Sequence, residues 1–349
     1  MEKIAIIAGD GIGIDVTQEA LKVLRAANQN FRLGLDLVEF EYGAEYFLKT
    51  GAGMPAGQID DFRRNYAAVF LGALGDPRVP DMRHGREILL AMRFELDLYI
   101  NLRPVQLYDE RLCPLKGKGV EDVNFVVFRE NTEGPYVGAG GILKKGTPDE
   151  VATQESIYTR KGVERIIRAA FEYARTHGRT RVTMSDKSNV LRFGHDLWQR
   201  AFAEVGEQYP EIEKEHYFVD ALVMKMVKAP EHFQVIVTEN MLGDIITDLG
   251  AMLQGGLGMA GSANIHPGQV SLFEPVHGSA PYMAGKNKAN PIAAILTVAM
   301  MLDYLGHTAA AQAVEAAVRR AVKENQVTAD IGGSLGTREC GSHIAKLLS

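Results

Sequence analysis

The stretch KIAIIAGDGIGIDVTQEALKVLRAAN, residues 3–28, contains an apolar run, a glycine-rich turn and a helical pattern in that order. Glycines alternate through residues 9–13, directly after the apolar run. Apolar residues then recur at a helical period, which predicts a helix that Asp15 or Thr17 caps and that continues through Asn28. A buried strand that turns directly into a helix is the repeating unit of α/β proteins.

The same alternation continues along the chain and predicts an α/β fold throughout. Further strands are predicted at residues 69–71, 98–102, 125–128 and 235–237, and further helices at residues 87–94, 162–176, 292–305 and 309–324. Residues 134–150 are rich in Gly and Lys and have no apolar periodicity, so we expect a projecting loop or arm there.

Composition bounds the class of protein. The 349 residues suffice for two domains or for one large α/β unit with an insertion. The net charge of −6 without a basic cluster argues against a nucleic-acid partner. The longest apolar stretch, residues 292–302, is about half the length that crosses a bilayer. Two cysteines and no signal-peptide layout favour a reducing, cytoplasmic location.

The glycine turn at residues 9–13 is similar to the start of a dinucleotide-binding fingerprint. The third glycine, however, falls one position early for Gly-x-Gly-x-x-Gly. A nucleotide contact remains one interpretation of this turn. The favoured one is a tight strand-to-helix connection that needs positive φ angles.

Two aspartates near the middle of the chain indicate a cation site. Residues 238–248 read as a strand end that opens into a helix, and Asp244 and Asp248 are four positions apart on one face of it. Two like charges so placed repel each other unless a cation lies between them, and hard carboxylate oxygens suit Mg²⁺ or Mn²⁺. A solvated acidic face is the alternative. The apolar Ile245 and Ile246 between them disfavour it.

Three arginines, Arg93, Arg103 and Arg129, lie close to predicted strand or helix ends. Guanidinium groups bind carboxylates through paired hydrogen bonds, so the cluster suggests a di- or tricarboxylate substrate. Each arginine could instead be an ordinary surface residue.

The helix that leads to Arg93 carries Arg86, Leu89 and Leu90 at positions that share its face. Two leucines beside a carboxylate-binding arginine would suit a substrate with an alkyl substituent. Packing of both leucines into the core is the alternative.

Taken together, these residues and further motifs resemble the decarboxylating β-hydroxyacid dehydrogenases, the family of isocitrate, 3-isopropylmalate, homoisocitrate and tartrate dehydrogenases. The matching motifs run in family order from residue 9 to about residue 333. They are Gly9-Asp10-Gly11-Ile12-Gly13, Asn101-Leu102-Arg103-Pro104, Arg129-Glu130-Asn131-Thr132-Glu133-Gly134-x-Tyr136, Asp186-Lys187-Ser188-Asn189, Asp220, Asn240-x-x-Gly243-Asp244-x-x-x-Asp248, Glu274-x-x-His277-Gly278-Ser279-Ala280-Pro281 and Asn290-Pro291.

The resemblance implies a two-domain, non-Rossmann fold of the isopropylmalate/isocitrate dehydrogenase type. Residues 1–97 plus 252–349 would form the large cofactor-binding domain. Residues 98–251 would form a smaller inserted domain for substrate, metal and dimerisation, with the active site in the cleft between the domains. The resemblance also implies a homodimer in which Lys187 and Asp220 complete the partner's site.

The resemblance further implies a role for each motif residue. Asp220, Asp244 and Asp248 would hold Mg²⁺ or Mn²⁺. Lys187 would assist removal of the hydroxyl proton, and Tyr136 would protonate the enolate that decarboxylation leaves. Carboxylate binding would fall to Arg93, Arg103 and Arg129. The residues implied for the cofactor are Glu274, His277, Gly278, Ser279, Ala280, Asn290, Asp330 and Asn189.

Leu89 and Leu90 match the leucines of isopropylmalate-type members, so we expect 3-isopropylmalate as the substrate, within leucine biosynthesis. Arg86 departs from that pattern and leaves isocitrate, homoisocitrate, tartrate and malate as alternatives. Tyr282 stands where NAD-using members usually have an acidic residue. Residues 328–333 nevertheless offer no cation for a 2′-phosphate, which favours NAD over NADP. A catalytically silent regulatory subunit is the alternative of another class, and the presence of Tyr136 and Lys187 with all three aspartates argues against it.

Overall fold

The computed structural model describes residues 2–348. The chain divides into two compact units. Unit 1 comprises Met1–Leu98, Gln106–Val120 and Ala251–Ser349, and unit 2 comprises Tyr99–Val105 and Glu121–Gly250.

The resemblance implies a continuous inserted domain over residues 98–251, and one segment within that range lies in unit 1. Gln106–Val120 belongs to unit 1, and its polar contacts give the reason. The backbone N–H of Gln106 donates to Gln254 Oε1 at 2.7 Å. The Arg111 guanidinium donates to the Val322 carbonyl oxygen at 2.9 Å and also to the Ile331 carbonyl oxygen.

Unit 1 contains five strands in the order β2-β1-β3-β12-β11. Their bounds are β1 Glu2–Gly9, β2 Leu35–Phe40, β3 Ala68–Ala73, β11 Gly261–Ile265 and β12 Ser271–Pro275. The pairs β1–β2, β1–β3 and β3–β12 are parallel, and β11–β12 is antiparallel. β3 is buried along its whole length, as a central parallel strand requires.

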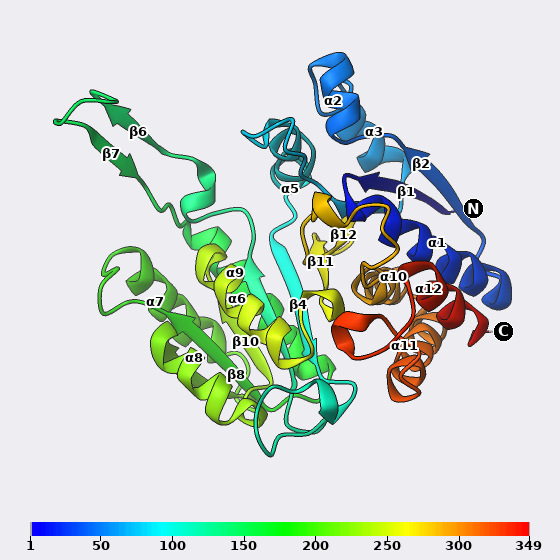
Figure 1. The fold of residues 1–349 in the computed structure, drawn as a ribbon. Coiled ribbons are helices and arrows are strands. Elements are labelled where there is room, and N and C mark those ends of the chain that lie inside the picture. The colour runs from blue at the N-terminus through cyan, green and yellow to red at the C-terminus, as the bar shows by residue number, and fades with distance from the viewer. Residues whose placement is uncertain (1, 349) are drawn as a thin grey trace. The chain divides into compact units, whose positions relative to one another are not determined.

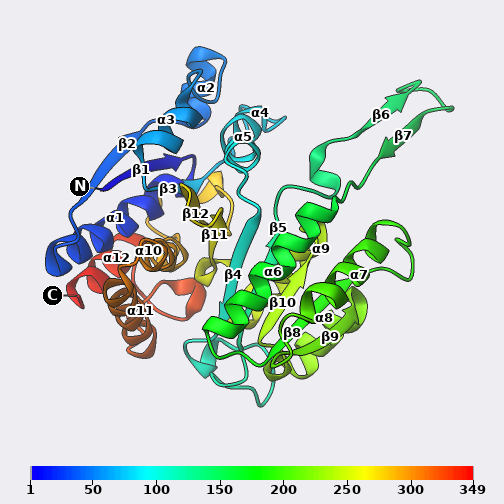
Figure 2. The same cartoon turned by 180° about the vertical axis from the view of Figure 1, so that it is seen from behind.

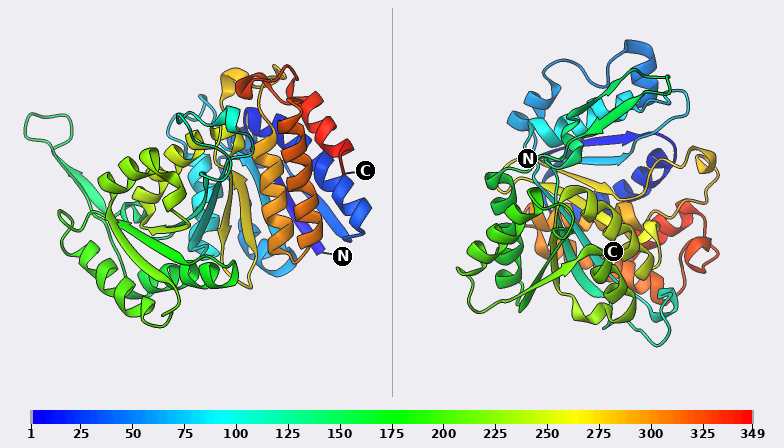
Figure 3. Two further views of the ribbon diagram at one scale, coloured as in Figure 1. Left: turned by 90° about the horizontal axis from the view of Figure 1, so that it is seen from below. Right: turned by 90° about the vertical axis from the view of Figure 1, so that its left-hand side faces the viewer.

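Helices cover these strands. They are α1 Ile12–Phe31, α2 Ala44–Thr50, α3 Gln58–Asn65, α4 Arg83–Gly85, α5 Ala91–Glu95, α10 Ile292–Tyr304, α11 Thr308–Lys323 and α12 Thr337–Lys346, with a π-helical turn at Arg86–Leu90. Figure 3 shows α1, α10, α11 and α12 side by side, and α10 also contacts β11 and β12. α10 is buried over most of its length, which explains why its sequence is apolar on every face.

Five strands of unit 2 pair side by side in the order β4-β5-β10-β8-β9. Their bounds are β4 Ile100–Gln106, β5 Asn124–Glu130, β8 Arg181–Asp186, β9 Glu213–Phe218 and β10 Val235–Thr238. The helices are α6 Arg160–Thr176, α7 Gly194–Gly206, α8 Val219–Lys228 and α9 Asn240–Leu253. Figure 2 shows α6 lying along β5 and β10, with its apolar stripe buried there.

The parallel register of unit 2 brings several motifs to one edge. Thr238 at the end of β10 pairs with Arg129 of β5 and with Ser185 of β8. The carboxyl ends of these three strands therefore lie next to one another, where ligands bind in open parallel sheets.

Two local predictions need correction. α1 begins at Ile12 and has Gly11 as its N-cap, without a capping side chain, so neither Asp15 nor Thr17 caps it. Asp15 lies in the first turn instead and accepts a hydrogen bond from the Gly285 N–H at 2.8 Å. The helix begins three residues earlier than Asp15 because the backbone of Gly11, with φ 54°, leads directly into it.

The predicted arm contains regular structure. β6 Gly140–Leu143 and β7 Val151–Gln154 form an antiparallel pair in register from Gly140↔Gln154 to Leu143↔Val151. Both strands are exposed along their length and extend away from the rest of unit 2 (Figure 1). Within residues 2–348 no helix combines the length and apolar character needed to cross a membrane.

The turn before α1 yields a stability prediction. Gly11 has φ +54°, and a Cβ there would lie 2.1 Å from the Ser279 carbonyl oxygen. We expect Gly11→Ala to lower the free energy of unfolding by about 3 kcal/mol or more. Gly34 also has a positive φ, +73°, but a Cβ there would meet nothing within 4 Å. Gly34→Ala is thus the matched control and should cost about 1 kcal/mol. Urea denaturation measures both, and equal losses would contradict the prediction.

Candidate active site

The predicted cation pair lies on α9, and a buried carboxylate holds the start of that helix. Glu239 accepts hydrogen bonds from the N–H groups of Met241 and Leu242 at 3.0 and 2.6 Å. Burial raises the pKa of Glu239, and these bonds oppose the rise. α9 therefore starts from a fixed end, and Asp244 and Asp248 follow on its second and third turns.

Arg129, at the end of β5, is almost fully buried and makes the strongest contact with this helix. Its Nη1 donates to Asp244 Oδ1 at 2.6 Å, and its Nε donates to the carbonyl and side-chain oxygens of Asn240 at 2.8 and 3.0 Å. A Cβ on Gly243 would lie 2.5 Å from Arg129 Cγ, so a glycine is needed for the arginine to cross the helix there.

Arg103 and Tyr136 approach the same carboxylate. Arg103 Nη2 lies 3.4 Å from Asp244 Oδ1, and Arg103 Nη1 donates to Thr247 Oγ1 at 2.5 Å. The Tyr136 hydroxyl donates to Asp244 Oδ2 at 3.2 Å. Two guanidinium groups and a phenol thus converge on one carboxylate, an arrangement suited to binding an anionic substrate beside an acid–base group.

Asp248 has a different environment. Partial burial and then the neighbouring Asp244 carboxylate raise its pKa, while Arg103 and Arg129 oppose the rise. A bound cation would remove the repulsion between the two carboxylates. Hard oxygens on one helical face fit Mg²⁺ or Mn²⁺, which completes its shell with water or substrate.

Lys187 and Asp220 form a separate pair, with Lys187 Nζ 2.7 Å from Asp220 Oδ1. The hydrogen bond from Lys187 is the main cause that lowers the pKa of Asp220. Residues 2–348 contain no group of three His, Cys, Asp or Glu side chains placed to share a metal. One chain therefore brings Asp244 and Asp248 together but leaves Asp220 outside that group.

Buried polar side chains fix the loop of Lys187. The Lys187 N–H donates to His195 Nδ1 at 2.7 Å. The preceding Asp186 is buried and accepts from Gln199 at 2.7 Å and from His216 Nε2 at 2.8 Å. These residues position the backbone of Lys187, and none of these hydrogen bonds involves its ammonium group.

In unit 1, Arg93 is buried and its Nη2 donates to Glu274 Oε1 at 2.8 Å. Asn264 donates to the same oxygen at 2.9 Å. The Nε of Arg93 is buried and has no hydrogen-bond partner within residues 2–348.

The predicted helical face around Arg93 is interrupted. A π-helical turn spans Arg86–Leu90 and carries an extra residue, which shifts the angular positions of the side chains. Arg86 is exposed while Arg93 is buried. Leu89 and Leu90 are half-buried, and Leu89 packs against the hydrophobic core of unit 1.

The residues implied for the cofactor in unit 1 lie in two connected loops. The Ser279 carbonyl accepts from the Ile12 N–H at 2.7 Å. Asn290 Oδ1 accepts from the Ile292 N–H at 3.0 Å, just before α10, whose N-cap is Pro291, and Asn290 Nδ2 donates to Asp330 Oδ2 at 3.0 Å. Burial lowers the pKa of His277, so this imidazole is held neutral.

The remaining residues of the cofactor set differ in exposure. Gly278 is exposed and Ala280 has a positive φ of 34°. Asn189 is an exposed residue of unit 2 that follows the Lys187 loop.

The glycine turn itself cannot act as a phosphate loop. The N–H groups of Asp10, Ile12 and Gly13 donate to the carbonyl oxygens of Ala73, Ser279 and Asp10 at 2.7, 2.7 and 2.9 Å. A phosphate would need these donors to be available. The interpretation as a tight turn is confirmed, with φ +73° at Gly9 and +54° at Gly11.

Sequence reasoning missed several residues that support the site, above all Thr247, Glu239 and His195. Thr247 has a detectable signal, because it lies one turn after Gly243 on the helix that carries both aspartates. His195 has no such signal, since only the folded chain brings it to Lys187.

Known proteins are similar to this chain over nearly its whole length. A family model described as isocitrate/isopropylmalate dehydrogenase matches residues 3–344. The chain is 47% identical to the 3-isopropylmalate dehydrogenase of Thermobifida fusca over 99% of this chain and 97% of that protein. It is 48% identical to the enzyme of the same name from Mycobacterium tuberculosis strain H37Rv over 95% and 98% of the two chains.

Solved structures are similar as well. The crystal structure of isocitrate dehydrogenase from Methylococcus capsulatus gives a TM-score of 0.89 at 37% identity, covering 100% of this chain and 99% of that one. The TT0538 protein from Thermus thermophilus gives 0.86 at 38% identity, covering 99% and 68%. The predicted α/β fold of this type and the family resemblance are confirmed.

One buried carboxylate next to Arg129 makes stability depend on pH. Glu130 is 1% exposed and accepts from the Thr132 hydroxyl and the Glu133 N–H, each at 2.7 Å. Burial raises its pKa to about 7 despite these bonds. Because an unfolded glutamate ionises near 4.5, the folded state binds more protons between these two values, and stability falls as pH rises through that window.

We therefore expect wild type to lose about 3 kcal/mol of unfolding free energy between pH 5 and pH 8, relative to Glu130→Gln. Denaturant melts across this range measure the difference. Glu207→Gln, which removes an exposed charge, is the control and should follow wild type. Parallel pH profiles for wild type and Glu130→Gln would show that Glu130 does not ionise in this window.

Proposed function

The chain belongs to the isocitrate/isopropylmalate dehydrogenase family, and on that premise we propose that it oxidises and decarboxylates 3-isopropylmalate with NAD. The products would be 4-methyl-2-oxopentanoate, CO₂ and NADH, as leucine biosynthesis requires. The observation that carries the substrate assignment is near-full-length identity of 47–48% with relatives that bear this name. The family and the relatives named 3-isopropylmalate dehydrogenase together indicate a decarboxylating dehydrogenase.

The α9 aspartates fit a divalent cation of Mg²⁺ or Mn²⁺ type by the chemistry of their donors. When bound, such a cation supplies Lewis-acid polarisation of the substrate hydroxyl and the adjacent carbonyl. Asp244 and Asp248 would hold it from one chain. Asp220 would come from a partner chain, since it lies outside their group in a single chain.

The arginines would hold the substrate carboxylates. Arg129 Nη1 donates to Asp244 Oδ1 at 2.6 Å, and Arg103 Nη2 approaches the same oxygen. A cation on Asp244 would compete for these oxygens and leave the two guanidinium groups to the substrate. Arg93 would bind a further carboxylate through its guanidinium group.

Proton transfer would be divided between two residues. Lys187 would take the hydroxyl proton while hydride passes from carbon to the nicotinamide. Tyr136 would then protonate the enolate carbon after CO₂ leaves. Its hydroxyl already donates to Asp244 Oδ2 at 3.2 Å, which orients the phenolic proton within the site.

A homodimer would complete the arrangement. Unit 2 exposes large apolar side chains on α8 and α9, among them Met224 at 67%, Val227 at 47% and Ile245 at 58%. Exposed apolar side chains of this size favour burial against a second copy. In that dimer Lys187 and Asp220 would serve the partner's site.

Cofactor choice follows from charge. The residues implied for the cofactor include the carboxylates Glu274 and Asp330 and no Lys or Arg. A 2′-phosphate would meet negative charge without a compensating cation, which favours NAD over NADP. Two free cysteines, one of them buried, support a reducing, cytoplasmic location.

We expect Asp244→Asn and Asp248→Asn each to lower kcat/KM by about a hundredfold or more, because several kcal/mol of Lewis-acid stabilisation would be lost. Both variants should also bind Mn²⁺ more weakly, as electron paramagnetic resonance of free Mn²⁺ would show. Asp196→Asn on α7 removes an exposed charge and serves as the control. Unchanged Mn²⁺ affinity in both variants would reduce the pair to a solvated acidic stripe.

A tricarboxylate substrate is the second candidate, because exposed Arg86 lies one turn before Leu89 and Leu90. If the leucines bind the isopropyl group, Leu90→Ala should shrink the preference for 3-isopropylmalate over malate by about 10–200-fold. Arg86→Ala should then leave that preference unchanged. Initial rates with 3-isopropylmalate, malate and isocitrate, each with NAD and NADP, measure this. Arg86-dependent isocitrate turnover that exceeds isopropylmalate turnover would overturn the substrate assignment.

A further inference from the structure

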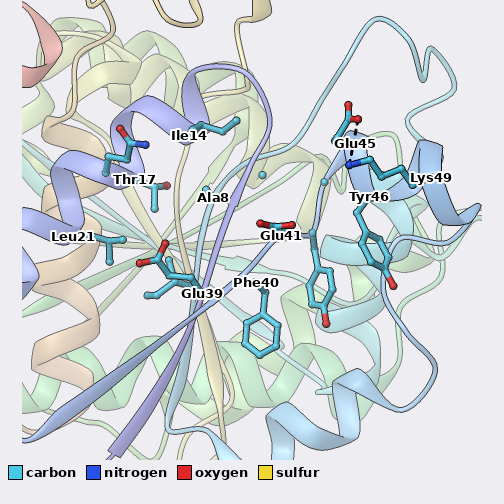
Figure 4. A pocket seen from close by; sticks show the side chains of 15 residues that line it. Ala8, Ile14, Thr17, Leu21, Glu39, Phe40, Glu41, Glu45, Tyr46 and Lys49 are labelled. Carbon is cyan, nitrogen blue, oxygen red and sulfur yellow. Dashed lines mark ion pairs between the residues drawn. The ribbon is translucent and has the colours of Figure 1, made fainter.

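Unit 1 contains a cavity of about 580 Å³ that none of the residues assigned to substrate, metal or cofactor lines. It lies between the first turns of α1, the carboxyl ends of β1 and β2, and α2 (Figure 4). Small-molecule sites have volumes of roughly 300–1,000 Å³ and favour the carboxyl ends of parallel strands. Its size and place are those of a ligand site.

The wall of the cavity is largely apolar and aromatic. Ile6 and Leu21 are buried beneath it. Phe40 stacks on Tyr42 with ring centroids 5.3 Å apart, and Tyr46 meets Tyr42 edge-on at 5.2 Å. The Tyr42 hydroxyl is already used, because it donates to Gln58 Oε1 at 2.8 Å. These rings therefore offer faces and edges for packing.

Three carboxylates line the cavity, those of Glu39, Glu41 and Glu45, and only two of them form ion pairs. Glu39 pairs with Arg25 at 2.9 Å. Glu45 pairs with Arg78 at 3.1 Å and, as Figure 4 shows, with Lys49, at 3.7 Å.

Glu41 is different from the other two. It is exposed and has no ion pair or hydrogen-bonded side-chain partner within residues 2–348, and Figure 4 shows its carboxylate among the other lining side chains. One negative charge beside aromatic rings is thus left without a counter-charge. The chemistry that complements it is a single positive charge on an apolar body.

A phosphate-bearing ligand is disfavoured here for two reasons. The turn N–H groups of Asp10, Ile12 and Gly13 already donate to backbone carbonyls. The carboxylates that line the cavity outnumber its one lysine. A nucleotide would bring its phosphates to a surface that repels them.

We propose that this cavity binds a compact organic cation, a primary or secondary ammonium that carries an aromatic or branched apolar group. The ammonium contacts Glu41, and the apolar group lies against Tyr42 and Tyr46. The site is separate from the active-site residues and does not depend on which hydroxyacid the enzyme uses.

The test uses 2-phenylethylamine as the probe and 2-phenylethanol as its uncharged counterpart. Isothermal titration calorimetry on the full-length protein measures both affinities, and amide NMR shifts at Gly43 and Ile14 locate the binding. We expect the amine to bind at millimolar or lower concentration and the alcohol at least about tenfold more weakly, the loss of one charge-assisted contact.

Two variants make the test specific. Glu41→Gln should weaken amine binding by at least about tenfold and leave hydroxyacid turnover unchanged. Glu121→Gln removes an exposed charge in unit 2 and should leave the affinity unchanged, which excludes a general effect of net charge. The proposal is overturned if the amine does not bind, if the alcohol binds equally well, or if Glu41→Gln binds the amine like wild type.

Discussion

The contact between the Arg129 guanidinium and the Asp244 carboxylate, 2.6 Å long, is the interaction on which the candidate site depends. A charge as deeply buried as that of Arg129 needs a partner, because an uncompensated ion in the interior is costly. Asp244 supplies it, Asn240 satisfies the Nε, and Gly243 leaves the space for the side chain. The same contacts anchor α9 to the end of β5. The residues proposed for chemistry are thus also the residues that hold this part of unit 2 together.

This dual role has a consequence for how the site responds to ligands. Asp244 accepts from Arg129 at Oδ1 and from Tyr136 at Oδ2, so both of its oxygens are hydrogen-bonded within the chain. Asp248 bears a raised pKa because it lies partly buried beside that carboxylate. A cation would relieve both the repulsion and the competition for Asp244. Substrate carboxylates could then replace Asp244 on the arginines, since they present the same kind of acceptor.

Unit 1 is organised by a buried carboxylate of a different kind. Asp10 accepts from the N–H groups of Ala44 and Gly75 at 2.7 and 2.8 Å, and lies 2.9 Å from His84 Nε2. It connects the glycine turn to two other loops. The Ser279 carbonyl, distant in sequence, accepts a hydrogen bond from the Ile12 N–H of the same turn. The turn therefore serves structure, while the loop that it holds contains residues proposed for the cofactor. Gly9 of the same turn also lines the cavity that we propose for an organic cation.

The sequence by itself determined the features that repeat over a few residues. Apolar periodicity located β1, α6 and α10 to within a few residues, and the spacing of four placed Asp244 and Asp248 on one helical face. The motifs supplied the family because their order along the chain is a property of sequence alone. Only the tertiary structure decided that residues 106–120 belong to unit 1, that a π turn interrupts the face of Arg86 and Arg93, and that His195 holds Lys187. These outcomes depend on contacts between segments that are distant in sequence and on the angular positions of side chains around a helix. A local sequence pattern does not show which distant group will accept a hydrogen bond from a buried donor.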